Sequence, residues 1–260
     1  GQTDESCARA WLWLQKHADW SPSEFFDYLR QKVNPKIAVE KTPVNTWKAS
    51  RLETIIRTYP NAKFLHLSRS VNGNAKSLKE FIRDQDKLLG RKDAEQLTGR
   101  ALSRHYPASV WYICHRNIFS MKPLIKQTNF LQIKGEDLLK HPKTILTQFC
   151  EWMNIDASPT SINAMLRSHE SPYAFVGPKI AIGGNDGKFM RQPVLRLKNT
   201  TMQESTQTFK EDASNEYHEL DYENFFKKYK SMSSRELQQI SRWCAQLSNE
   251  IHAMQLRLGY

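Results

Sequence analysis

The sequence predicts an α/β protein with a parallel sheet flanked by helices, organised as a single domain over residues 1–260. Short apolar segments and amphipathic segments alternate between residues 36 and 153, as strands and helices do in βαβ units. The chain has 260 residues, of which 39% are hydrophobic, so it can bury one large core or at most form two small domains. It contains no internal repeat, and nothing in its composition requires a division into two domains.

The first predicted elements lead from a helix into the sheet. Residues 21–33 begin with Ser21-Pro22-Ser23-Glu24, which places serine at the N-cap, proline at the first helical position and glutamate at the third. Residues 36–40, Lys-Ile-Ala-Val-Glu, are predicted to form a short strand. Apolar residues at helical spacing predict a helix over residues 52–59, and residues 63–68 are predicted to form a buried strand.

Loop and helix signals follow this second strand. Asn72-Gly73 predicts a loop over residues 70–74, because this dipeptide is typical of turns. Apolar residues at helical spacing then predict helices over residues 75–89 and 108–120. Residues 130–134 are predicted to form a third short strand.

The chain beyond the third strand ends in a long amphipathic helix. Pro142 begins a helix that carries apolar residues as far as Met153. Residues 154–230 are rich in Gly, Pro, Asn and Ser and are predicted to form long loops. Ser233-x-x-Glu236 is a capping box, which predicts the start of the last helix. Its apolar stripe consists of Leu237, Ile240, Trp243, Leu247, Ile251, Met254 and Leu258.

Charge narrows the class of partner. The chain has 38 Lys and Arg against 27 Asp and Glu, which gives a net charge of +11. A basic surface suits a polyanionic partner, which could be nucleic acid, a phosphorylated cofactor or an anionic lipid face. A soluble protein with lysine-rich helices is the alternative explanation, and charge alone identifies no ligand.

Cysteine usage and hydropathy exclude further classes. The four cysteines are widely spaced, which predicts neither a metal site nor a disulfide framework and favours a cytoplasmic location. They are Cys7, Cys114, Cys150 and Cys244. No apolar run approaches the roughly 18 residues of a membrane span.

Candidate site residues follow the predicted strands. Ligands of open parallel sheets bind beyond the carboxyl ends of the strands, where Glu40-Lys41-Thr42-Pro43, Arg69 and Gly135-Glu136-Asp137-Leu138 all lie. Arg69 presents a fork of donors suited to a phosphate, and Ser77 could add a hydroxyl to the same group. A purely structural arginine at a strand end is the alternative.

These segments resemble the sulfotransferases that use 3′-phosphoadenosine 5′-phosphosulfate (PAPS). The resemblance lies in Glu40-Lys41-Thr42-Pro43, in the stretch from Tyr59 to Arg69 with Ser77 eight residues later, and in Gly135-Glu136-Asp137-Leu138. It implies a P-loop-NTPase-like sulfotransferase fold. Further segments resemble a bacterial branch, some members of which act on small hydroxylated or carrier-bound acyl substrates. These segments are His169 to Ala174, Gly183 to Phe189 and Leu256 to Tyr260.

The resemblance also assigns roles around the donor. It implies that Arg69 and Ser77 hold the 3′-phosphate and that Lys41 lies near the transferring sulfonate. A lysine there can neutralise charge on the bridging oxygen as the sulfur–oxygen bond breaks; a solvated lysine is the alternative. Gly187, Lys188 and Arg191 are expected to close over the nucleotide, or else to form a plain flexible loop.

The reaction also needs a base for the acceptor proton. His169 is the first candidate, on the resemblance and on its place before a loop expected to line the cleft. Glu40 is the second. No metal ion is expected to take part.

Two departures from the family pattern stand out. This chain has Arg69-Ser70-Val71 where the family has Arg-Asp-Pro. The family's loop for the 5′-phosphosulfate, of the form P-x-S-G-T-T after an N-terminal strand, does not occur in the sequence. We therefore expect an N-terminally shortened piece or absent residues rather than a degenerate protein.

The expected function is in-line transfer of a sulfonate from PAPS to a hydroxyl of a small-molecule or carrier-bound acceptor, with 3′-phosphoadenosine 5′-phosphate as product. A non-catalytic domain of the same fold that binds a nucleotide or an anionic partner is the alternative. A basic nucleic-acid or polysaccharide binder is a third reading, and no nucleic-acid partner is expected. The sequence identifies neither the acceptor nor the oligomeric state.

Overall fold

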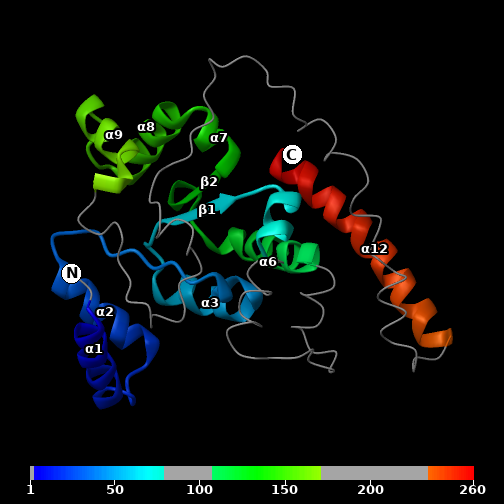
Figure 1. Ribbon diagram of the computed structural model, residues 1–260, viewed down its shortest axis with the longest axis horizontal. Coiled ribbons are helices and arrows are strands. Elements are labelled where there is room, and N and C mark those ends of the chain that lie inside the picture. The colour runs from blue at the N-terminus through cyan, green and yellow to red at the C-terminus, as the bar shows by residue number, and fades with distance from the viewer. Residues whose placement is uncertain (1–2, 79–106, 171–233) are drawn as a thin grey trace. The chain divides into compact units, whose positions relative to one another are not determined.

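The computed structural model describes residues 3–78, 107–170 and 234–260 (Figure 1). The chain forms two compact units. The first consists of residues 1–42 and 137–198, and the second of residues 43–136 and 199–260. Among the described helices, none has both the length and the apolar character that a membrane span requires.

The second unit contains a parallel pair of strands. β1 (Phe64–Ser68) pairs with β2 (Phe130–Lys134), with Phe64 opposite Phe130. Both strands lie where the sequence predicts them, and the parallel pairing confirms the predicted α/β class. Because side chains alternate along a strand, His66 and Ser68 are buried while Leu65 and Leu67 face outward.

The core of this unit is built around α6 (Pro107–Met121), which confirms the helix predicted at 108–120. α6 packs against α3 (Ala49–Thr58), against the 3₁₀-helix η1 (Pro43–Trp47) and against α12 (Ser234–Leu258). The buried core residues are Val71, Ala108, Trp111, Phe119, Leu247, Ile251, Met254 and Leu258. Four of them belong to the apolar stripe predicted for the last helix. The 3₁₀-helices η2 (Lys122–Leu124) and η3 (Gln127–Asn129) connect α6 to β2.

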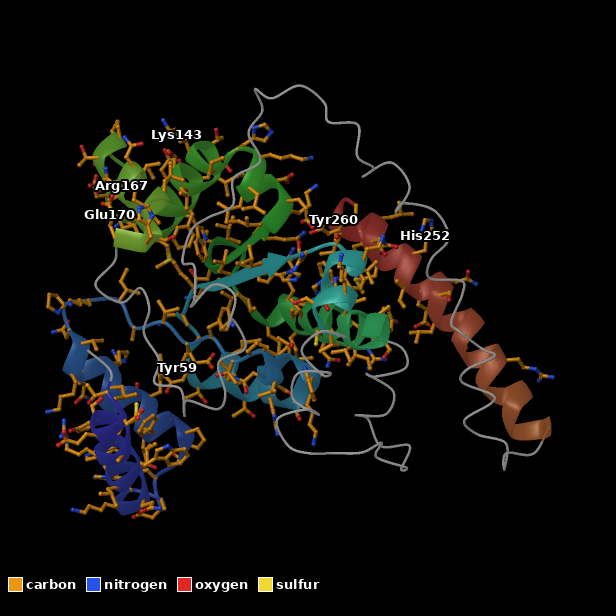
Figure 2. All side chains as sticks on the ribbon, in the orientation of Figure 1. Tyr59, Lys143, Arg167, Glu170, His252 and Tyr260 are labelled. Carbon is orange, nitrogen blue, oxygen red and sulfur yellow. The ribbon has the colours of Figure 1, made fainter. Side chains whose placement is uncertain are left out.

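α12 ends in a Schellman motif. Gly259 has φ +81°, a left-handed conformation that favours glycine. Its N–H donates to the carbonyl of Leu256, and the N–H of Tyr260 donates to the carbonyl of Gln255. This turn directs Tyr260 back against the core, where it packs beside the buried residues (Figure 2).

The first unit begins with two capped helices, α1 (Asp4–Lys16) and α2 (Pro22–Val33). The predicted start of α2 is confirmed, because Ser21 and Glu24 form a reciprocal capping box. The two helices pack together through a cluster of aromatic rings, which contact one another edge-on, tilted or stacked. The cluster consists of Trp13, His17, Trp20, Phe25 and Tyr28.

The same unit contains the helices that follow residue 136. α8 (Pro142–Met153) begins at the predicted proline and packs against α9 (Pro159–Leu166). Cys150 of α8 is buried, and its thiol contacts the Met165 sulfur at 3.6 Å. The 3₁₀-helix η4 (Ser168–Glu170) follows α9. The short helix α7 (Gly135–Lys140) spans the boundary of the two units.

The strand predicted at residues 36–40 is wrong. These residues have an irregular conformation, and the sheet of the described residues contains β1 and β2 alone. Ile37 and Val39 are 53% and 80% exposed. A strand requires a hydrogen-bonded neighbour, and local sequence cannot supply one.

The loop predicted at residues 70–74 is also wrong beyond its first residue. A helix begins at Val71 and includes Asn72-Gly73. The described part of this helix ends at residue 78, so the remainder of the helix predicted at 75–89 lies outside the described residues. Within the predicted loop region 154–230, residues 159–166 form α9, while residues 171–230 and the predicted Ser233 cap lie outside.

A pair of histidines is buried between β1 and α6. His66 Nε2 lies 3.4 Å from His115 Nδ1, and both residues are less than a tenth exposed. Trp111, Phe119 and Phe130 surround the pair with aromatic rings. Burial, reinforced by Lys122, lowers the pKa of His66 to about 4. Burial and the neighbouring His66 lower the pKa of His115 to about 3. Both rings are therefore neutral at pH 7.

This pair predicts a loss of stability in mild acid. In the unfolded chain both imidazoles titrate near 6.5, so between pH 6.5 and 4 the unfolded state binds more protons than the folded state. The free energy of unfolding should therefore decrease as the pH falls through this window. His115→Gln should reduce the slope by up to about 1.4 kcal/mol per pH unit, measured by denaturant titration at each pH. His252→Gln, an exposed position on α12 (Figure 2), should leave the slope unchanged. Equal slopes in all three proteins would contradict this account.

Candidate functional site

The candidate site lies at the carboxyl ends of β1 and β2. Arg69 follows β1 directly, and the helix at residues 71–78 begins two residues later. Glu136 lies in the first turn of α7, directly after β2. Parallel strands bring their carboxyl ends to one edge of the sheet, so these segments meet there although they are distant in sequence.

Glu136 completes the start of the helix at 71–78. The N–H of Ser70 donates to Glu136 Oε1 at 2.9 Å, and the N–H of Gly73 donates to Ser70 Oγ at 3.3 Å. In an ordinary capping box the glutamate stands at the third helical position. Gly73 occupies that position here. Glu136, which follows the neighbouring strand, accepts the N–H of Ser70 in place of the glutamate of an ordinary capping box.

Tyr260 binds the other oxygen of the same carboxylate. Its hydroxyl donates to Glu136 Oε2 at 2.9 Å and lies 3.2 Å from Ser68 Oγ. Lys134 Nζ donates to the carbonyl of Gly259 at 3.0 Å, where a cation stabilises the C-terminal end of α12. Figure 2 shows Tyr260 at the end of α12 that reaches the strands. We call Glu136, Ser70, Tyr260 and Ser68 the edge network.

The edge network favours an ionised Glu136. Burial acts to raise the pKa of this carboxyl, but hydrogen bonds from the Ser70 backbone, from its own backbone and from the Tyr260 hydroxyl outweigh burial. The net result is a pKa below the ordinary value. Glu136 is therefore a carboxylate at neutral pH.

Arg69 has a fixed backbone and an exposed side chain. The indole N–H of buried Trp111 donates to the Arg69 carbonyl at 2.8 Å, and Val71 is fully buried two residues further on. The guanidinium crosses the first turn of the following helix, because a Cβ built on Gly73 would lie only 2.6 Å from Arg69 Nε. Ser77 is exposed and lies four residues after Gly73, on the same helix face.

This arrangement suits a phosphate group. The guanidinium fork and the Ser77 hydroxyl are both accessible on one face of the helix. Among the described residues, no carboxylate forms an ion pair with Arg69. The sequence prediction that Arg69 and Ser77 act together is therefore compatible with the structure, and their role in binding stays a prediction.

The predicted catalytic residues lie in the other compact unit. Glu40 and Lys41 occupy the exposed irregular segment between α2 and η1. His169 is exposed in η4, with its Nε2 3.9 Å from Glu170 Oε1. Glu170 also accepts from Arg167 Nε at 3.0 Å (Figure 2). One anionic side chain, that of Glu170, thus lies beside the imidazole of His169. That His169 and Arg69 belong to one site stays a prediction.

The remaining predicted binding residues, Gly187, Lys188 and Arg191, lie outside the described residues. In the described part of the chain, no group of three or more His, Cys, Asp or Glu side chains could hold a metal ion.

Sequence reasoning assigned no role to three residues of this edge: Gly73, Glu136 and Tyr260. Gly73 belongs to an Asn-Gly dipeptide, which usually indicates a turn rather than a helix. Glu136 stood in a segment noted for its place after a strand and for its resemblance, and Tyr260 stood in a segment noted for its resemblance alone. The signal available for Tyr260 was its position after Gly259, since a Gly at a helix end commonly turns the next residue back onto the core.

The edge network predicts a measurable contribution from the Tyr260 hydroxyl. Tyr260→Phe should lower the free energy of unfolding at pH 7 by about 1.5–3 kcal/mol, the range for a hydrogen bond to a charged group. The difference should shrink as the pH is lowered through the titration of Glu136, because a protonated carboxyl accepts more weakly. Tyr28→Phe in the α1–α2 pair is the control, since the described structure gives its hydroxyl no hydrogen bond. Equal effects of both variants would argue against the network.

Comparison with known proteins identifies the family. The model of the sulfotransferase family matches residues 4–159, more than half of the chain. A search of curated proteins finds no significant match.

Two solved structures share the fold with a TM-score of 0.51. The sulfotransferase domain from the curacin biosynthetic pathway is 22% identical, and the match covers 67% of this chain and 57% of that domain. The sulfotransferase domain from the Synechococcus PCC 7002 olefin synthase is 20% identical, with 74% and 59% covered. The chain thus spans less than two thirds of either neighbour. On the family match, with both neighbours sharing the fold, this chain belongs to the sulfotransferase family.

Proposed function

We propose that this protein transfers a sulfonate group from PAPS to an acceptor hydroxyl. The observation that carries the proposal is the course of the Arg69 side chain over Gly73, on the helix face that also holds Ser77. A guanidinium and a hydroxyl on one face provide the donors that a 3′-phosphate needs. Family membership supports sulfonate transfer as the reaction.

The chemistry is an in-line displacement. The acceptor oxygen forms a bond to sulfur while the bond from sulfur to the bridging oxygen of the 5′-phosphate breaks, and the acceptor proton passes to a base. We assign Lys41 to the charge that develops on the bridging oxygen. His169 is the proposed base, with Glu40 second, and Gly187, Lys188 and Arg191 are proposed to cover the nucleotide.

The proposed acceptor is a hydroxylated small molecule or a carrier-bound molecule, and the proposed location is the cytoplasm. Both structural neighbours are described as sulfotransferase domains of biosynthetic systems, one of the curacin pathway and one of an olefin synthase. A non-catalytic nucleotide-binding domain is the second candidate, because the Arg69 geometry supports binding whether or not transfer follows. Turnover separates the two.

Binding of the product nucleotide tests the donor site. 3′-Phosphoadenosine 5′-phosphate should raise the melting temperature more than adenosine 5′-phosphate does, because a ligand that binds the folded state stabilises it. Arg69→Ala should abolish this preference. Arg57→Ala removes another exposed arginine, from α3, and should preserve it. Equal shifts from the two nucleotides in the unaltered protein would overturn the assignment of the 3′-phosphate.

Lys41 is tested by turnover. Lys41→Ala should reduce the turnover number by about two orders of magnitude or more, the scale for losing a preorganised charge donor, with a smaller change in nucleotide affinity. Lys36→Ala, an exposed lysine of the same irregular segment, is the control. Loss of affinity with turnover intact at saturation would make Lys41 a binding residue instead.

The base is tested by the pH dependence of turnover. If His169 accepts the acceptor proton, activity should decrease on the acidic side, because a protonated imidazole cannot accept a second proton. His169→Asn should flatten that limb, while Glu40→Gln and the exposed control His252→Asn should retain it. The reverse pattern for the first two variants would transfer the role to Glu40.

A further inference from the structure

Gly73 stands in a helix without a conformational need for glycine. It lies in the first turn of the helix at 71–78, and its backbone is not in the left-handed region, unlike that of Gly259. Glycine inside a helix costs about 0.5–1 kcal/mol relative to alanine through lost backbone entropy. A glycine here therefore calls for a reason other than backbone geometry.

The reason is the space that the Arg69 side chain occupies. A Cβ on Gly73 would lie 2.6 Å from Arg69 Nε and 3.2 Å from both Cζ and Nη2. All three atoms belong to the guanidinium end of one side chain, so the missing methyl group leaves a groove for that group.

The backbone around Gly73 is held in place by contacts with the rest of the unit. Trp111 holds the Arg69 carbonyl, Glu136 holds the N–H of Ser70, and Val71 is fully buried. A methyl group at position 73 must therefore displace the guanidinium rather than the main chain. An exposed arginine can swing into solvent at little cost to folding.

We infer that Gly73 is a positioning residue for the donor nucleotide. Because Gly73 has no side chain, the Arg69 guanidinium can lie on the helix face of Ser77, and this position sets the preference for a 3′-phosphate. This inference rests on the proposed function. It adds that the preference depends on the absence of a side chain at position 73, and that a variant with a more favourable helix residue there should bind the nucleotide less well.

The inference predicts opposite effects on stability and on binding. Gly73→Ala should match or raise the melting temperature of the free protein, because alanine is the better helix residue. The same change should reduce the affinity for 3′-phosphoadenosine 5′-phosphate about tenfold, or roughly 1.4 kcal/mol. The affinity for adenosine 5′-phosphate, which lacks the 3′-phosphate, should stay the same. Isothermal titration calorimetry with both nucleotides gives the ratio of affinities directly.

Two further variants separate positioning from a general structural effect. Asn74→Ala makes a similar gain in helix propensity at the neighbouring position and should leave the affinity ratio unchanged. In an Arg69→Ala background, Gly73→Ala should change the ratio no further, because its effect acts through the guanidinium that is already absent.

The outcomes are distinct. Three results would each overturn the positioning role. Gly73→Ala could leave the affinity ratio unchanged, it could lower that ratio equally in the Arg69→Ala background, or it could markedly reduce the stability of the free protein. The last result would show that the glycine serves packing. Equal affinities of the unaltered protein for the two nucleotides would instead overturn the proposed function, and the positioning role with it.

Discussion

The carboxylate of Glu136 joins three parts of the chain at one edge of the sheet. One oxygen accepts the N–H of Ser70 and the other accepts the hydroxyl of Tyr260. The first contact begins the helix that carries Ser77, and the second connects the end of α12 to both strands. Because Val71 and the apolar stripe of α12 share one core, the polar network and the hydrophobic core fix the same segments.

The edge network also bears on the charge of Arg69, with which no carboxylate of the described residues forms an ion pair. A carboxylate beside a guanidinium usually forms an ion pair with it. The oxygens of Glu136 are already engaged by a backbone amide and a phenol, both of which hold the charged form. The negative charge stabilises the fold, and the positive charge of Arg69 stays at the surface. The net positive charge of the chain also favours interaction with anions.

Local sequence predicted the elements whose ends are set by their own residues. The capping box of Ser21 and Glu24 places the start of α2, and Pro142 places that of α8, because the relevant contacts lie within one turn. The short apolar segments of β1 and β2 were also sufficient to predict these strands.

Contacts over longer distances decided the rest. The helix at 71–78 uses a glutamate 66 residues away, so Asn72-Gly73 looked like a turn. Residues 36–40 looked like a strand because nothing local reveals the absence of a neighbour. The place of Arg69 directly after a strand could be predicted from the sequence, whereas the close approach of its side chain to Gly73 is visible only in the structure.

The contact between Ser68 and Tyr260 spans 192 residues of sequence and has a consequence for biosynthesis. A nascent chain emerges from the ribosome over many seconds, and its N-terminal parts fold first. β1, α6 and β2 can assemble while α12 is still being made, but their shared edge then lacks the phenol that holds Glu136. The core residues of α12 are absent at that stage too, which leaves part of the α6 surface uncovered. Completion of this edge therefore waits until α12 has been synthesised, and until then the exposed apolar surface can bind chaperones.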